Sequence, residues 1–278
     1  MNTLTEKELE ELREKLLNKI EVHVLKYHVS LGNYLGSSEL DPPIGSGTFV
    51  KFSIASHGIY GILTAAHVVK DLKFGLLGQP ASVGLSKLQN GDTIACSVSF
   101  SYIYGCVEIE GFHSNSNDGY RPDIAFIALG TDGRLPDHEL ITESSFYDLD
   151  TNTDLVMHDP QIVSAFYRGA APKRPDDLLD TAVCIGGGET LRFDDKAQLQ
   201  YWEIPNDTNK SIAGGSGAGF WRFYCENGQI TPSLEGVIIS EEATNYSYFE
   251  AMSTSYLYET FLPGLKDVCA KELIGKNS

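Results

Sequence analysis

The rest of the chain is organised around one glycine-rich stretch, Ala213-Gly214-Gly215-Ser216-Gly217-Ala218-Gly219, which Phe220 and Trp221 follow at once. Glycine on both sides of Ser216 disfavours a helix or a regular strand and allows a tight loop with positive φ angles. Such a loop holds the serine hydroxyl away from the backbone and directs neighbouring N–H groups toward the same point. A nucleophile beside hydrogen-bond donors is the arrangement that acyl transfer requires. Taken alone, the same stretch is also typical of an ordinary Gly/Ser-rich turn.

The composition is that of an ordinary globular chain, and 278 residues can bury one large core or two modest ones. A formal net charge of −17 argues against nucleic acid as a partner. The first 19 residues lack the apolar core of a signal peptide, and no apolar run could span a bilayer. We therefore expect a cytoplasmic protein without a membrane partner. The five cysteines are odd in number and form no CxxC pair, so we expect reduced thiols. No His/Cys cluster has the spacing of metal ligands, so we expect no metal, and we expect no cofactor.

Residues 1–30 are predicted to form an N-terminal helix. Thr5 and Glu8 match a capping box, in which each side chain satisfies a backbone N–H of the other residue. Leucine and isoleucine then recur at helical spacing, at Leu9, Leu12, Leu16 and Ile20. This apolar stripe must be covered, either by the body of the same chain or by a partner or second copy.

Beyond the helix the pattern changes to short β-branched and aromatic runs separated by Gly, Asn, Asp and Ser. Such runs without intervening helices predict an antiparallel β-sandwich or barrel rather than an α/β sheet. The expected strands are residues 48–52, 60–64, 94–104, 106–109, 124–129, 161–167, 182–185, 199–204, 219–224, 234–240 and 246–252.

These strands fall into two groups of similar size, and a helical pattern returns near the end of the chain. We therefore expect an all-β fold of two antiparallel β-barrels, residues 31–145 and 146–256, framed by two terminal helices. The C-terminal helix is expected within residues 257–278 and should begin near Pro263-Gly264, which interrupts the helical pattern.

His67 is the base that we expect for Ser216, because a serine hydroxyl is a weak nucleophile without a base in hydrogen-bond reach. It follows an apolar strand and two alanines, whose small side chains let the imidazole lie close to a neighbouring segment. The base in turn needs a carboxylate, and Asp123 stands at the start of an apolar strand, where an unpaired charge would be costly. His57 lies in a turn and His113 in a Ser/Asn-rich loop, so neither follows such a strand.

Together these segments resemble the trypsin-like serine peptidases of the chymotrypsin fold, whose motifs T-A-A-H, D-[IVL]-A and G-x-S-G-G occur in that order. The matching stretches are Thr64-Ala65-Ala66-His67, Asp123-Ile124-Ala125 and Gly214-Gly215-Ser216-Gly217-Ala218. Gly45-Ser46-Gly47-Thr48-Phe49-Val50 is similar to the strand lead-in of bacterial members. The resemblance covers roughly residues 40–255, with intervals that suit one barrel supplying His and Asp and the other supplying Ser.

The resemblance implies an intracellular bacterial serine endopeptidase that acts on protein or peptide substrates through a covalent acyl-enzyme. By this resemblance Ser216 is the nucleophile, His67 the general base and then acid, and Asp123 the orienting carboxylate. The backbone N–H groups of Gly214 and Ser216 would form the oxyanion hole.

Cleavage specificity stays open at this point. By the resemblance, Lys210 matches the base of the primary specificity pocket and would favour acidic side chains, although a lysine in a polar loop is also typically solvent-facing. Ser240 matches the strand that borders the pocket and pairs with substrate backbone. Glu241, Glu242 and Glu250 follow near the same wall and favour basic substrates instead.

One departure from the family bears on regulation. Gly215 stands where digestive members carry an aspartate that anchors the N-terminus created by zymogen cleavage. We therefore expect control through the oxyanion loop or through a protein partner docked on the N-terminal helix. A companion subunit of a stress or antiviral system is one candidate, although no residue identifies it. The alternative is a catalytically silent domain that serves as a protein-interaction module, whereas the order of the three residues disfavours an α/β-hydrolase esterase.

Overall fold

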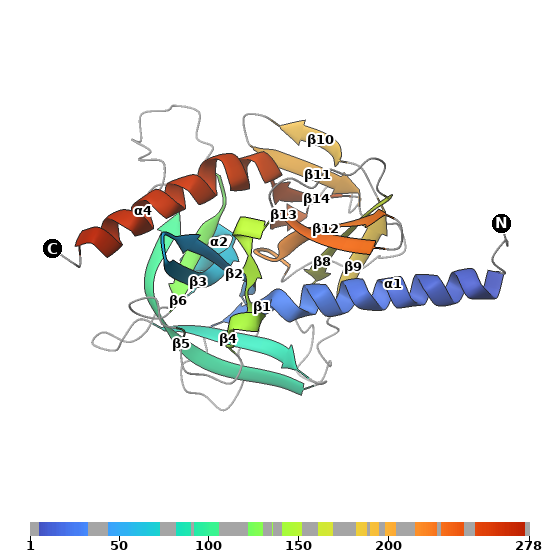
Figure 1. The fold of residues 1–278 in the computed structure, drawn as a ribbon, viewed down its shortest axis with the longest axis horizontal. Helices are drawn as coiled ribbons and strands as arrows, with labels where there is room; N and C mark the ends of the chain where they lie inside the picture. Colours follow the sequence, from blue (N-terminus) through green and yellow to red (C-terminus); the bar gives the residue numbers. More distant parts are fainter. Residues whose placement is uncertain are drawn as a thin grey trace.

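The computed structural model of the chain contains two β-sheets side by side, with one long helix packed against each (Figure 1). The structure describes residues 6–32, 44–72, 82–89, 92–105, 122–129, 135, 141–151, 161–168, 182–187, 190–194, 198–203, 215–226, 229–241 and 248–275.

The first sheet closes on itself as a six-stranded antiparallel barrel, because β1 pairs with both β2 and β4. Around the barrel the strands follow the order β1-β4-β5-β6-β3-β2, and the short β7 adds to β2 in parallel. The strands are β1 (His28–Gly32), β2 (Gly45–Ile54), β3 (His57–Thr64), β4 (Ser82–Gln89), β5 (Asp92–Gly105), β6 (Ala125–Leu129) and β7 (Tyr147–Asp148). Every residue of β6 is buried, as expected for a continuous apolar strand inside the fold.

The second sheet is curled and open, a half-barrel in which the described strands follow the order β10-β11-β14-β13-β12-β8-β9. Its strands are β8 (Gln161–Arg168), β9 (Ala182–Gly187), β10 (Thr190–Asp194), β11 (Leu199–Glu203), β12 (Gly219–Glu226), β13 (Gln229–Glu241) and β14 (Tyr248–Met252). The expectation of two barrels is thus confirmed for the first sheet and, for the second, only in the coarser form of a curled half-barrel.

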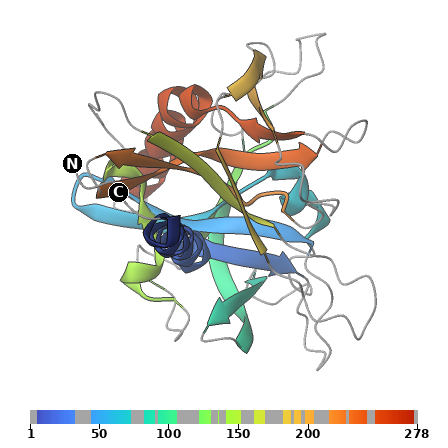
Figure 2. The same ribbon diagram turned by 90° about the vertical axis from the view of Figure 1, so that its right-hand side faces the viewer.

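Helix α1 (Glu6–Tyr27) lies along the second sheet and is seen end-on in Figure 2. Ile20 and Val24 are fully buried, and Leu16 packs against the same core, so the apolar stripe faces the body of the chain. Burying one such aliphatic side chain contributes about 1.5–3 kcal/mol. Thr5 lies outside the described residues, as do the side chains of Glu8, Leu9 and Leu12.

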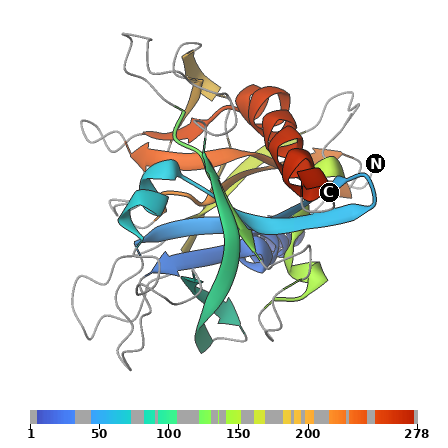
Figure 3. The same cartoon turned by 90° about the vertical axis from the view of Figure 1, so that its left-hand side faces the viewer.

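The C-terminal helix lies across the first barrel (Figure 3), and it differs from the expected helix at its start. The chain is already helical before Pro263, through the π-helical turn Tyr256–Phe261, and α4 (Leu262–Gly275) continues it. A proline lacks an N–H and crowds the carbonyl one turn earlier, and a wider π turn accommodates both effects. Lys266 of α4 forms an ion pair with Asp150, at 2.6 Å between Nζ and Oδ1. The Tyr104 hydroxyl of β5 donates to Glu272 over 2.6 Å.

Candidate active site

His67 lies in the first turn of a short helix, α2 (Ala66–Asp71), rather than on a continuing strand. The strand β3 ends at Thr64, and Ala65 is the N-terminal cap of the helix but makes no side-chain capping bond. The first N–H groups of a helix have no partner within it. The Asp123 carboxylate, which precedes β6, supplies a partner for one of them, because its Oδ1 accepts the backbone N–H of His67 over 2.8 Å.

Strand register explains why Asp123 reaches this helix. Thr64, at the end of β3, is paired with Ala125, at the start of β6. Since the two strands are antiparallel, the residues that follow β3 and those that precede β6 leave the barrel at the same end. Asp123, two residues before β6, therefore lies beside the first turn of α2.

The second oxygen of Asp123 binds the imidazole ring of His67. Oδ2 lies 2.5 Å from Nδ1, and the two side chains are 22% and 41% exposed, respectively. An ionised carboxylate is only an acceptor, so Nδ1 carries the proton in this pair, and Nε2 is the ring nitrogen left to accept one. Asp123 thus fixes both the backbone and the tautomer of His67, which leaves a nitrogen suited to general-base chemistry.

The pKa of the Asp123 carboxyl is lowered from its ordinary value. Burial acts to raise it, but the hydrogen bond from the His67 ring, the charge of that ring and the bond from the His67 backbone together outweigh burial. Asp123 is therefore ionised at neutral pH, as its acceptor role requires.

Ser216 lies in a tight turn that leads into β12 and packs against the same end of the barrel. The Ser46 N–H of β2 donates to the Ser216 carbonyl over 2.7 Å, and Ala218 N–H closes the turn onto Gly215 O over 2.9 Å. Gly217 has a φ of +89°. A Cβ there would fall 2.1 Å from Ser46 O and 2.3 Å from Thr64 Oγ1, so only glycine fits.

The serine turn and the histidine helix meet at Gly45. A Cβ at that position would lie 2.6 Å from a methyl of Val68 and 3.0 Å from the Ser216 carbonyl oxygen. Val68 directly follows His67, so the missing side chain of Gly45 lets α2 and the Ser216 turn approach the same point of β2.

The Ser216 hydroxyl donates to the carbonyl oxygen of Ile239, in β13, over 3.0 Å. Although both residues are described, no hydrogen bond joins this hydroxyl to the His67 ring. The three sequence-predicted residues are therefore partly assembled: Asp123 and His67 are joined, whereas Ser216 is bonded elsewhere.

No protein-family model matches the sequence. A comparison with curated proteins likewise finds no significant match, so sequence similarity assigns the chain to no family. Among the described residues, no group of His, Cys, Asp or Glu side chains is arranged to hold a metal ion. No helix in the described ranges combines the length and the apolar character needed to cross a membrane.

The remaining predicted residues are placed less completely. Lys210, Gly214 and Glu242 lie outside the described residues, as does His113. His57 is exposed and lies next to Ser56, remote from Ser216 in the strand register. On β13 the backbone of Ser240 is paired opposite Glu250 of β14, with a bulge between Ile238 and Ser240. The chain at Ser240 therefore lies directly beyond the carbonyl that binds the Ser216 hydroxyl.

Sequence reasoning missed residues of β2, β3 and β13 that hold the serine turn in place. The Thr64 hydroxyl is buried and donates to Ser46 O over 2.6 Å, which ties the end of β3 to β2 beneath Gly217. The small residues of Gly45-Ser46-Gly47 were a usable signal, because a strand start without bulky side chains suits close backbone contact. No sequence signal singled out Ile239, since its role belongs to the backbone carbonyl.

Proposed function

We propose that the chain is a trypsin-like serine endopeptidase of the chymotrypsin fold. The observation that carries the proposal is the pair of hydrogen bonds that His67 donates to Asp123, beside a glycine-flanked serine packed on the same barrel end. The closed barrel and the curled second sheet are compatible with this fold, and the chain order His, Asp, Ser supports it.

In the proposed reaction Ser216 attacks the carbonyl carbon of the scissile peptide bond while His67 Nε2 takes the hydroxyl proton. The Asp123 carboxylate stabilises the resulting imidazolium. His67 then gives the proton to the leaving amine, which leaves an acyl group on Ser216. Water, deprotonated by the same ring, hydrolyses the ester and regenerates the serine. The backbone N–H groups of Gly214 and Ser216 are the proposed oxyanion donors.

The bond from Ser216 to Ile239 describes a resting state of the proposed enzyme. A hydrogen bond of this kind contributes about 1 kcal/mol net, so a substrate or a partner can readily offset its loss. We propose that activity is controlled through this serine and its loop by a protein partner on α1. Removal of an N-terminal peptide is not required in this scheme.

The second candidate is a catalytically silent domain that acts as an interaction module. The same Ile239 bond favours it, because a serine held permanently away from His67 cannot transfer its proton. The two candidates differ in one measurable property, which is whether Ser216 ever becomes nucleophilic.

A fluorophosphonate probe tests this property. We expect covalent labelling of the purified chain at Ser216, lost in Ser216→Ala and retained in Ser56→Ala, which removes an exposed serine elsewhere. Labelling that survives Ser216→Ala would contradict the assignment of the nucleophile. No labelling, with or without co-purifying proteins, would favour the interaction module. For a labelled enzyme, a peptide-library profile would show whether the site prefers acidic residues, through Lys210, or basic residues, through Glu241, Glu242 and Glu250.

A further inference from the structure

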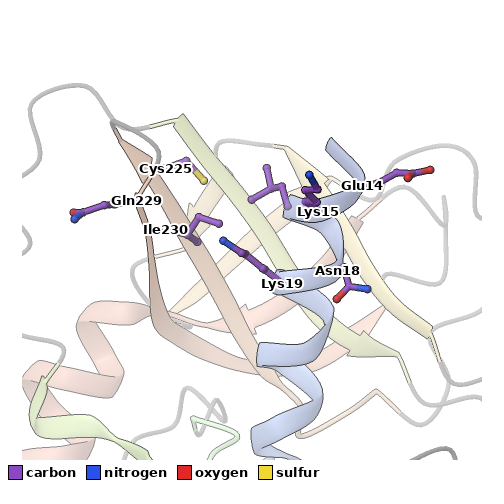
Figure 4. A pocket seen from close by; sticks show the side chains of 8 residues that line it. Glu14, Lys15, Asn18, Lys19, Cys225, Gln229 and Ile230 are labelled. Atoms are coloured by element: carbon purple, nitrogen blue, oxygen red, sulfur yellow. The ribbon is translucent and has the colours of Figure 1, made fainter. Parts of the chain in front are cut away.

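A second surface feature lies far along β12 from the serine turn, where helix α1 passes the tip of the β12–β13 hairpin. It is an open pocket of about 670 Å³, lined by Glu14, Lys15, Leu16, Asn18, Lys19, Cys225, Gln229 and Ile230 (Figure 4). Cys225 is the penultimate residue of β12, which ends at Glu226, whereas Ser216 precedes this strand. The pocket is therefore separate from the candidate active site, although both are built on the same strand.

The inner wall of the pocket is mostly apolar. Leu16 and Ile230 are half-buried and pack against the core, and Cys225 is half-buried beside them. The volume lies within the range of about 300–1,000 Å³ that is usual for ligand pockets. It has room for apolar side chains of a ligand.

The rim that faces the hairpin is cationic. Lys15 and Lys19 are exposed, are one helical turn apart, and have no ion-pair partner among the described residues. Figure 4 shows Lys19 reaching toward Ile230 and the carboxylate of Glu14 pointing away from the hairpin. This rim is a local exception on a chain whose net charge is −17. An acidic ligand would be repelled by most of the surface and attracted here, which favours one binding orientation.

The dimensions fit a short stretch of polypeptide. From Glu14 to Lys19 the helix axis advances about 8 Å. Two or three residues of extended chain cover the same length, at about 3.3 Å each. We propose that this pocket binds an acidic segment of a partner protein, with one or two apolar side chains between Leu16 and Ile230 and carboxylates at Lys15 and Lys19. The inference deepens the partner proposal made above and rests on it, but it does not depend on peptidase activity.

The test uses fluorescent nonapeptides in which a central leucine or isoleucine is flanked by Asp and Glu, compared with versions carrying Asn and Gln. We expect the acidic peptides to bind the full chain more tightly, with an affinity that falls as salt rises. Lys19→Glu should weaken binding three- to tenfold. Arg13→Glu makes the same change of charge on the same helix outside the pocket and should leave affinity unchanged. If the charge reversal in Lys19→Glu disturbs folding, the double variant Lys15→Gln/Lys19→Gln replaces it and should also weaken binding of the acidic peptides.

Peptide binding should also protect Cys225 from N-ethylmaleimide, with half-buried Cys96, in β5, as the internal reference. Equal binding of the amide peptides, equal effects of Lys19→Glu and Arg13→Glu, or no binding at all would overturn the proposal. So would a dimer of the chain in sedimentation that Lys19→Glu dissociates, because a second copy would then be the occupant. If Ser216 were not labelled but the acidic peptides still bound, the peptidase proposal would fail and the proposal for this pocket would stand.

Discussion

Gly217 lies directly against Thr64, so that a Cβ on this glycine would fall 2.3 Å from the threonine Oγ1. The serine turn therefore lies directly against the side chain of Thr64 at the end of β3, and the Thr64 hydroxyl donates to Ser46 O over 2.6 Å. This contact fixes where the Ser216 turn lies relative to the strand that leads into His67.

We therefore expect Gly217→Ala to destabilise the fold by about 1–3 kcal/mol and to abolish labelling of Ser216, because alanine resists the positive φ and has no room. Thermal unfolding and probe labelling measure the two effects. Gly58→Ala, at the far end of β3, is the control, because the nearest atoms to its Cβ would belong to the Tyr60 side chain, at 3.1 Å or more. A stable, fully labelled Gly217→Ala would show that the turn is not held as described.

Asp123→Asn separates the two roles of this residue. The remaining amide oxygen can still accept the His67 N–H and cap α2, but the amide nitrogen cannot accept from Nδ1. We expect stability close to that of the parent and a loss of activity of about 10⁴, the loss known for the template mechanism. Asp123→Ala should lose the cap as well, at about 1 kcal/mol. Chemical unfolding together with labelling rates distinguishes the variants, and equal stability of the two would contradict the capping role.

The Asp123 carboxyl also predicts a pH dependence of stability. Its pKa is lowered in the folded protein, so the ionised form contributes stability that is fully present above the unfolded pKa of about 3.9. That contribution is lost as pH falls through the folded pKa. The free energy of unfolding should therefore decline on acidification more steeply in the parent than in Asp123→Asn. Parallel curves for the two proteins below pH 5 would refute this.

His23 of α1 provides a second pH effect. It is packed against the rings of Tyr27, Tyr147, Trp221 and Phe223. Burial, aided by the charge of Lys26, lowers the pKa of His23 to about 4 from the ordinary 6.5. Between about pH 4 and pH 6.5 the unfolded chain binds more protons at His23 than the folded chain does. The free energy of unfolding should therefore rise with pH in this range.

His23→Phe should flatten that slope and raise stability near pH 5, because it also removes a buried Nε2 that has no hydrogen-bond partner among the described residues. His57→Phe changes an exposed histidine and is the matched control. Denaturation at a series of pH values gives the comparison, and an unchanged slope in His23→Phe would exclude His23 as its source.

Several elements could be predicted from sequence because their signals are local. Alternation and β-branched residues located β2, β3 and β6 closely. Residues 106–109, expected as a strand, lie outside the described residues. The strands β1, β4, β7 and β10 were not predicted. β7 has only two residues, and β1 follows α1 without a break, so neither has a pattern of its own.

At the candidate site, too, features set by neighbouring residues in the sequence could be predicted, whereas those set by distant segments could not. His67, Asp123 and Ser216 were selected from their flanking residues, but the helix that holds His67 was not expected. Six residues with the β-branched pair Val68 and Val69 have weak helical propensity, and the backbone N–H of His67 is capped by Asp123, from the distant segment that precedes β6. The bond from Ser216 to Ile239 depends on a side-chain rotamer, which no sequence pattern specifies.

Helix α1 ends at Tyr27, and β1 begins at the next residue, so one continuous segment packs on the second sheet and then enters the barrel wall. Residues 6–32 therefore behave as a strap across the two halves of the molecule. We expect the chain to tolerate a split after Gly32 by fragment complementation: the excised N-terminal piece should reassociate with the remainder and close the barrel between β2 and β4. The N-terminal region would then be an exchangeable component of the fold, supplied in trans and withdrawn by dilution.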